Sequence, residues 1–230
     1  MPADSTGYCY LCGANLGKTA MKNHILKFHG GDKGEQDCYL LKVEGSYKKE
    51  YWLYIDIPVE KTLSSIDSFL RKIWLECCGH LSAFFGSGRV EMGKGRKLGN
   101  LAVGDKFFHE YDFGSTTETD ITIIENTTRK QQKDIVRLLA RNAPPVFHCK
   151  DCGKQAEFIY MEPDDQYKLP FYCAECSENY DEFMLNPVTN SPRMGECGYN
   201  GELDTFAFDP ASVAQKVTPQ RPSLKRRKQK

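Results

Sequence analysis

The sequence lacks a membrane span and a secretory signal. No apolar run approaches the ~20 residues that a transmembrane helix needs. The first residues, Met-Pro-Ala-Asp-Ser, show no charged segment followed by an apolar stretch, which a signal peptide would require. We therefore expect no membrane partner and a reducing, cytoplasmic location, or a nuclear one if the organism is eukaryotic.

The sequence also lacks a net charge, because 31 Lys and Arg residues balance 31 Asp and Glu residues. This total argues against a uniformly basic nucleic-acid binder but says nothing about how the charges are distributed. At roughly 100–200 residues per domain, a chain of this size accommodates one good core with small satellites.

A disulfide framework is not expected in a reducing compartment, so the ten cysteines need another explanation. Six of them form pairs separated by two residues, which is the spacing of zinc knuckles. Cys77 and Cys78 are adjacent and lack this geometry, so we assign them no site. The pairs are Cys9/Cys12, Cys149/Cys152 and Cys173/Cys176, and the unpaired cysteines are Cys38, Cys77, Cys78 and Cys197.

The amino-terminal segment has the ligand types of a zinc finger. Cys9 and Cys12 are followed, after eleven residues, by His24 and His29, and Leu16 and Met21 fall where a small ββα core needs apolar side chains. Residues 8–29 therefore resemble a classical two-Cys, two-His finger, which usually has twelve central residues. In the alternative interpretation, the cysteines form a buried turn and the histidines lie on the surface.

The second set of ligands predicts a four-Cys zinc ribbon. Cys149 and Cys152 precede Cys173 and Cys176 by twenty residues, and four thiolates leave no open position on the metal. Zinc there would be structural, as in the finger, which gives two structural zinc ions per chain. A redox C-x-x-C is the competing interpretation, and His148 is a possible substitute ligand or a surface residue.

The segment between the two zinc modules predicts an α+β layer. Aromatic and β-branched stretches favour strands, whereas apolar residues from Leu63 to Cys77 recur every three to four positions, as in an amphipathic helix capped by Thr62 or Ser64. We expect a mostly antiparallel sheet with one main helix. The expected strands are 39–43, 50–58, 81–85, 106–112 and 119–125, and residues 135–140 are ambiguous between strand and helix.

Four motifs lie within about residues 39–126 of this segment. They are Tyr51-Trp52-Leu53-Tyr54-Ile55, Leu63-Ser64-Ser65-Ile66-Asp67, Cys78-Gly79-His80-Leu81 and Phe107-Phe108-His109-Glu110-Tyr111-Asp112-Phe113-Gly114. These motifs resemble the plasmid Ri open-reading-frame-three family, also called the insertion-element passenger family. The resemblance implies a fold and little biochemistry, because the family offers no activity to carry over. Members often continue after the glycine of the last motif with an acidic residue, a Trp and a His, whereas this chain has Ser115-Thr116-Thr117-Glu118, so a site built on that His is absent.

Three signatures of catalysis are incomplete. Residues 88–95 nearly match a phosphate-binding loop, but Gly95 stands where Ser or Thr would hold magnesium. The tripeptide 112–114 lacks the other kinase motifs. His80, His109 and Asp112 could form an acid/base set, although a histidine on a strand is more often a packing residue.

The charges are segregated along the chain. Residues 127–154 carry a net charge of +5, residues 155–209 carry −10, and residues 210–230 carry +7. The last segment has few apolar residues, so we predict a disordered basic tail, which either contacts phosphates or pairs with the acidic segment.

These observations predict four regions: a zinc finger (1–36), the α+β domain (37–142), a zinc ribbon with a docking loop (143–209) and the basic tail (210–230). We expect a non-enzymatic protein that contacts DNA or RNA through basic side chains. A protein-interaction adaptor is the alternative, and an enzyme acting through the central domain is the third hypothesis. The predicted phosphate contacts are Lys18, Lys22, Lys27, Arg129, Lys130, Lys133, Arg137, Arg141, Lys225, Arg226, Arg227 and Lys228.

Overall fold

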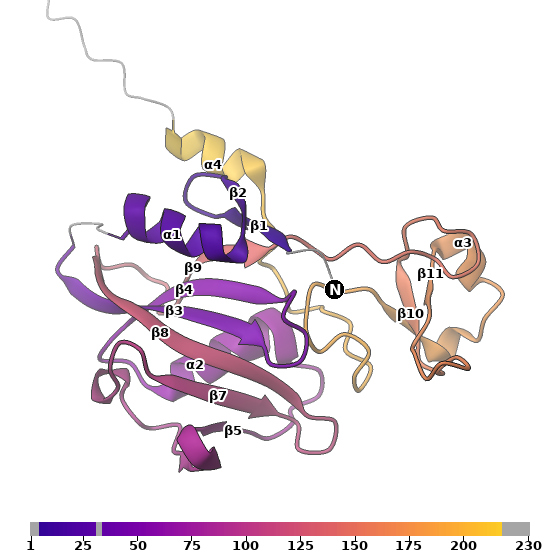
Figure 1. The fold of residues 1–230 in the computed structure, drawn as a ribbon, viewed down its shortest axis with the longest axis horizontal. Helices are drawn as coiled ribbons and strands as arrows, with labels where there is room; N and C mark the ends of the chain where they lie inside the picture. The colour runs from indigo at the N-terminus through magenta and orange to yellow at the C-terminus, as the bar shows by residue number, and fades with distance from the viewer. Residues whose placement is uncertain (1–4, 31–33, 218–230) are drawn as a thin grey trace, which may run out of the picture.

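The fold is an antiparallel sheet of nine strands in a computed structural model that describes residues 5–30 and 34–217 (Figure 1). The strand order is β2-β1-β9-β4-β3-β8-β7-β5-β6, and every neighbouring pair is antiparallel. The strands are β1 (Thr6–Cys9), β2 (Asn15–Gly17), β3 (Gln36–Gly45), β4 (Trp52–Pro58), β5 (Ser82–Phe85), β6 (Glu91–Met92), β7 (Lys106–Tyr111), β8 (Thr117–Arg129) and β9 (Arg137–Asn142).

One face of the sheet packs against the main helix. This helix is α2 (Leu63–Leu70), continued by a π-helical turn, η1 (Arg71–Leu75). Its apolar side chains meet alternate residues of the central strands, such as Leu41 on β3 and Ile55 on β4, in the largest core cluster. The expected helix and the mostly antiparallel sheet are therefore confirmed, and the ambiguous residues 135–140 overlap strand β9.

The predicted finger, residues 8–29, covers part of the opposite face. Its hairpin, β1 and β2, pairs with β9 and so extends the main sheet, and its helix α1 (Lys18–Phe28) lies over that face (Figure 1). Met21 and Ile25 of α1 pack against Trp52 and Tyr54 of β4. Because both faces of β4 are covered, every residue of this strand is buried.

The predicted ribbon forms a small lobe beside the sheet, on the right of Figure 1. Its three strands pair in the order β11-β10-β12. Its own core is small, with Cys149, Tyr172 and Cys173 buried and Tyr160 and Tyr180 packed against them. The elements are β10 (Phe158–Tyr160), β11 (Phe171–Tyr172), α3 (Ala174–Ser177), η4 (Glu182–Met184) and β12 (Leu185–Pro187).

After the ribbon the chain returns to the central domain. The Ser191 hydroxyl donates to the carbonyl of Trp74 at 2.6 Å, and the Asn190 and Asn142 side chains bond at 2.7 Å. We expected this loop to dock on the ribbon. It packs mainly on the central domain, although Gly195 also lies close to Ile159 of the ribbon.

The segment predicted to be disordered begins with a helix. Residues 210–217 form α4 (Pro210–Val217), and Val213 is buried, which corrects the prediction for these residues. The remainder, 218–230, lies outside the described residues, as do Lys225, Arg226, Arg227 and Lys228. None of the helices in the described part of the chain has the length and apolarity needed to cross a bilayer.

Candidate metal centres and basic surface

The four predicted finger ligands lie together. Cys9 ends β1 and Cys12 lies in the turn that follows, whereas His24 belongs to α1 and His29 caps the end of this helix. The Cys12 Sγ and His24 Nε2 atoms are 3.2 Å apart, as are the Nε2 atoms of His24 and His29, and all four ligand atoms lie within 4.8 Å of one another. Gly13, with φ of +79°, closes the cysteine turn by donating to the Cys9 carbonyl. These side chains could hold a metal ion.

The four ribbon cysteines also converge. The Sγ atoms of Cys152 and Cys173 are 3.6 Å apart, and all four sulfurs lie within 4.8 Å of one another. Gly153 adopts φ of +73°, as a zinc knuckle requires, and donates to the Cys149 carbonyl at 2.9 Å. Two matched knuckles that face each other favour a metal site over an isolated redox pair.

The backbone of the ribbon favours the thiolate of Cys149, whereas the neighbouring thiols raise the pKa of Cys176. Burial raises the pKa of Cys149, but hydrogen bonds from the backbone of Cys173, Cys152 and Asp151 outweigh it and lower this pKa to about 6. His148 is exposed, and its Nδ1 lies 3.2 Å from the Gly153 carbonyl. It does not belong to the ligand group.

A third group of metal-ligating side chains was missed by sequence reasoning. Cys77, Cys78 and His80, which follow η1, meet Cys197 of the returning segment, and their ligand atoms also lie within 4.8 Å of one another. The sequence pattern assigns no site to the adjacent cysteines Cys77 and Cys78 and leaves Cys197 unpaired. The available signal was three ligating residues within four positions, together with one unassigned cysteine later in the chain.

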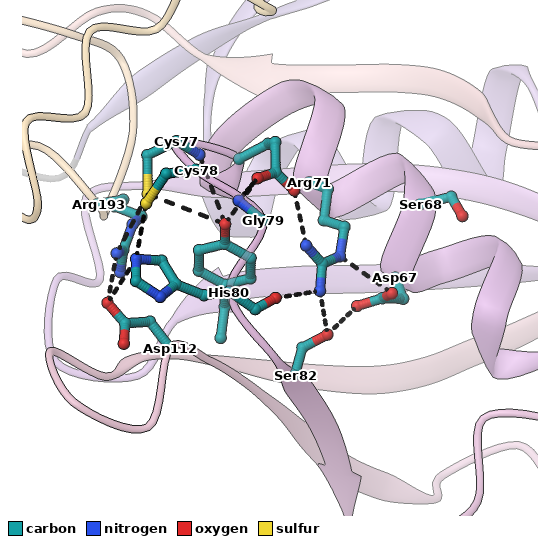
Figure 2. A network of polar contacts seen from close by, with 12 residues as sticks. Asp67, Ser68, Arg71, Cys77, Cys78, Gly79, His80, Ser82, Asp112 and Arg193 are labelled. Atoms are coloured by element: carbon teal, nitrogen blue, oxygen red, sulfur yellow. Dashed lines mark hydrogen bonds and ion pairs between the residues drawn. The ribbon is translucent and has the colours of Figure 1, made fainter.

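The three candidate acid/base residues do not form one set. His109 is fully buried, and its Nε2 lies 2.7 Å from Asp67 Oδ1. His80 lies instead beside Asp112, with its Nε2 3.4 Å from Asp112 Oδ2. Residues 88–95, which nearly match a phosphate-binding loop, have another role. Lys94 of this segment donates to Asp67 at 3.0 Å and to the Ser82 hydroxyl at 2.6 Å (Figure 2 shows Asp67 and Ser82).

Three of the predicted phosphate contacts are engaged inside the protein. Arg129 is buried and its Nη1 lies 2.5 Å from Asp56 Oδ1, while Arg137 binds the other carboxylate oxygen of Asp56. Arg141 is buried and holds Asp204 at 2.6 Å. These carboxylates neutralise the guanidinium groups, so we remove all three arginines from the proposed surface; Lys130 and Lys133 are exposed.

Two predicted finger lysines line an open groove. Lys18 and Lys22 of α1 border a cavity of about 560 Å³ over the part of the sheet that α1 leaves uncovered. Glu44 and Asp120 contribute negative charge to its lining. Lys18 and Lys42 outweigh burial and hold the pKa of Glu44 below its usual value. Lys27 is exposed farther along α1. The other basic residues of the groove are Lys42, Arg89 and Lys106.

Comparisons with known proteins identify no family. No family model matches the chain, and no curated protein matches it. A solved structure, a protein of unknown function called MM3350 from Methanosarcina mazei Go1, is 18% identical, with a TM-score of 0.41. The match covers 51% of this chain and 75% of that one.

Proposed function

We propose that this is a non-enzymatic zinc-binding protein that contacts nucleic acid through the groove between α1 and the sheet. The observation that carries the proposal is the basic lining of this groove, where five cationic side chains face two carboxylates. A second element of the proposal is the relationship to the plasmid Ri open-reading-frame-three family, which rests on the motifs of residues 39–126.

Zinc is the metal that best fits the two predicted ligand sets. A regular tetrahedron with Zn–S bonds of about 2.3 Å places two sulfurs about 3.8 Å apart, and Zn–N bonds of about 2.05 Å place two nitrogens about 3.3 Å apart. The observed separations of 3.6 Å in the ribbon and 3.2 Å between the finger histidines are close to these values. Both sets are closed, so each ion would support the fold and take no part in a reaction.

The groove has features that suit a phosphate chain. Lys22 and Lys106 form no ion pair within the described part of the chain, so their charges are available to a ligand. Phe108, which is partly exposed, adds aromatic surface. Positively charged grooves with aromatic side chains bind single strands by phosphate contacts and base stacking. The basic residues of the tail would add salt-sensitive affinity.

A salt titration tests this proposal. Fluorescence anisotropy would measure the binding of labelled single- and double-stranded DNA and RNA oligonucleotides from 20 to about 200 mM salt. The variant Lys22→Glu/Lys106→Glu should bind at least severalfold more weakly. Losing two phosphate contacts should also reduce the slope of log K against log salt by about 1.4–1.8.

A matched variant controls for total charge. Lys72→Glu makes the same change of side chain on η1, across the sheet from the groove, and should bind like the wild type. The single variant Lys22→Glu, which has the same total charge as Lys72→Glu, should bind more weakly. No binding of any oligonucleotide at the lowest salt would contradict the nucleic-acid hypothesis.

A protein partner is the second candidate, and a feature of the ribbon favours it. Tyr167 and Phe183 are 92% and 88% exposed there. Exposed aromatic side chains are enriched in protein interfaces. An adaptor would retain its partner after Lys22→Glu/Lys106→Glu and lose it after Tyr167→Ser/Phe183→Ser.

An enzyme of the central domain has the weakest support. His109 is buried against Asp67, whereas His80 and Asp112 lie with the cysteine group. The three residues therefore do not form the single acid/base set that this hypothesis requires.

A further inference from the structure

We infer that Cys77, Cys78, His80 and Cys197 bind a third structural zinc ion, which fastens the returning C-terminal segment (188–206) to the central domain. Three thiolates and one imidazole form one of the ligand sets typical of structural zinc. These residues belong to neither of the two predicted modules.

The ligand separations support a tetrahedral site. Cys78 Sγ lies 3.7 Å from both Cys77 Sγ and Cys197 Sγ, close to the sulfur separation of about 3.8 Å around zinc. His80 Nε2 lies 3.0 Å from Cys78 Sγ and 3.2 Å from Cys197 Sγ. The sulfur–nitrogen distance of 3.2 Å in the finger is comparable. The third group thus has the compactness of the two predicted zinc sites.

The backbone on both sides of the group turns sharply. Gly79, with φ of +82° and no neighbour within 4 Å of its Cβ position, lets the chain reverse between Cys78 and His80. Cys197 itself adopts φ of +47°, which is unfavourable for a residue with a side chain. The strained turn places its sulfur against the other ligands, and metal coordination would offset that strain.

Buried polar side chains lie beside the ligands, and Figure 2 shows two of them, Arg193 and Asp112, near Cys77, Cys78 and His80. Arg193 is fully buried and its Nη2 donates to Cys77 Sγ at 3.4 Å and to Asp112 Oδ2 at 2.7 Å. Its Nη1 donates to the Ser115 carbonyl at 3.0 Å. Outer contacts of this kind orient metal ligands and stabilise bound thiolates, and a guanidinium also balances the excess negative charge of three thiolates around one zinc ion.

The ion would join two distant parts of the chain. Cys78 and Cys197 are 119 positions apart, and the returning segment is already anchored by Ser191 on Trp74 and by Arg193 on Asp112. Binding of Cys197 to the ion, as its fourth ligand, would complete this attachment. Both Cys78 and Cys197 are exposed, so an ion in solution can reach the site.

Native mass spectrometry of the full chain, purified with zinc and without chelator, tests the inference. Wild type should carry three zinc ions, and Cys197→Ser should carry two. Cys38→Ser is the matched control because Cys38 lies outside all three groups, and it should retain three. The variant His80→Asn should behave like Cys197→Ser, which guards against misfolding of a single variant.

Hydrogen exchange gives a second readout. Amides of 191–199 should exchange faster in Cys197→Ser than in Cys38→Ser, whereas amides of the finger and ribbon should be unaffected. Equal zinc content in wild type and Cys197→Ser would overturn the inference. A wild-type protein that carries two ions and has a mass lower by two hydrogens would also overturn the inference, because two cysteines of the third group would then form a disulfide. Loss of zinc from Cys9→Ser or Cys152→Ser bears only on the two predicted sites, so the two proposals can fail separately.

Discussion

Asp56 is a carboxylate buried on β4 between two guanidinium groups. It is 2% exposed and pairs with Arg129, which is 1% exposed, and with Arg137. Arg129 also donates to the carbonyls of Asp134 and Ile135. The basic block of residues 127–154 therefore includes charges that hold β8, β4 and the loop before β9 together.

The variant Asp56→Ala should be strongly destabilised, because it leaves a buried guanidinium without its counter-ion. We expect a loss of about 3–5 kcal/mol in the free energy of unfolding. Urea denaturation followed by tryptophan fluorescence would measure it. Asp134→Ala, which removes an exposed carboxylate of the same block, should change stability by less than about 0.5 kcal/mol. Similar losses in the two variants would argue against a structural role for the Asp56 pairs.

His109 makes stability depend on pH. Burial lowers the pKa of His109, and its Nδ1 has no partner, so a second ring proton would be a buried donor without an acceptor. Hydrogen bonds from His109, Ser82 and Lys94 outweigh burial and hold the pKa of Asp67 well below its usual value. The folded protein thus keeps a neutral imidazole that donates to a carboxylate.

The free energy of unfolding should fall as the pH drops below about 6.5, the unfolded pKa of histidine, because the unfolded chain then binds a proton that the folded chain does not. The contribution is fully present above that pH. His109→Gln removes the titrating group, so the stability difference between wild type and variant should shrink from pH 7.5 to 5.5. Zinc ligands protonate in both proteins and cancel in the comparison. A difference that stays constant with pH would contradict this role of His109.

At the scale of elements, the sequence pattern predicted the helices and strands that depend on local sequence. The apolar spacing of residues 63–77 predicted α2 and η1, and the content of aromatic and β-branched residues predicted the central strands. The spacing of the six paired cysteines and of His24 and His29 likewise located two candidate metal sites. The attachment of the finger to β9 was not predictable, because pairing between distant strands leaves no local signal. The third ligand group was not predictable for the same reason, because only the fold brings Cys197 close to the other three ligands.

Gly7 allows this attachment of the finger hairpin. A Cβ atom at Gly7 would lie 2.2 Å from the Arg141 carbonyl and 2.6 Å from the Trp52 ring. Gly7→Ala should push β1 away from β9 and cost about 1–3 kcal/mol of stability, as overpacking usually does. Gly17→Ala is the control, since a Cβ there meets nothing within 4 Å and φ is −66°. Thermal denaturation would compare them, and equal melting temperatures would show that the hairpin is not held tightly.

At the scale of the whole molecule, the two predicted zinc modules differ in how they connect to the core. The finger shares its core with the sheet, because Met21 and Ile25 pack against Leu40, Trp52 and Tyr54. The ribbon has a separate small core around Cys149, Tyr172 and Cys173. The two candidate metal sites are therefore connected to the sheet in different ways.

Replacing one candidate metal ligand in each module should reveal this difference. Cys152→Ser should unfold the ribbon lobe, because its core is too small to fold without metal, and leave the nine-stranded sheet intact. Cys9→Ser should loosen α1 and uncover Trp52 and Tyr54, and thereby destabilise the sheet itself. Hydrogen exchange would show faster exchange confined to 148–187 in the first variant, and extending into β4 and β9 in the second. If Cys9→Ser left β4 and β9 fully protected, the finger would be an independent unit attached to a sheet that does not need it.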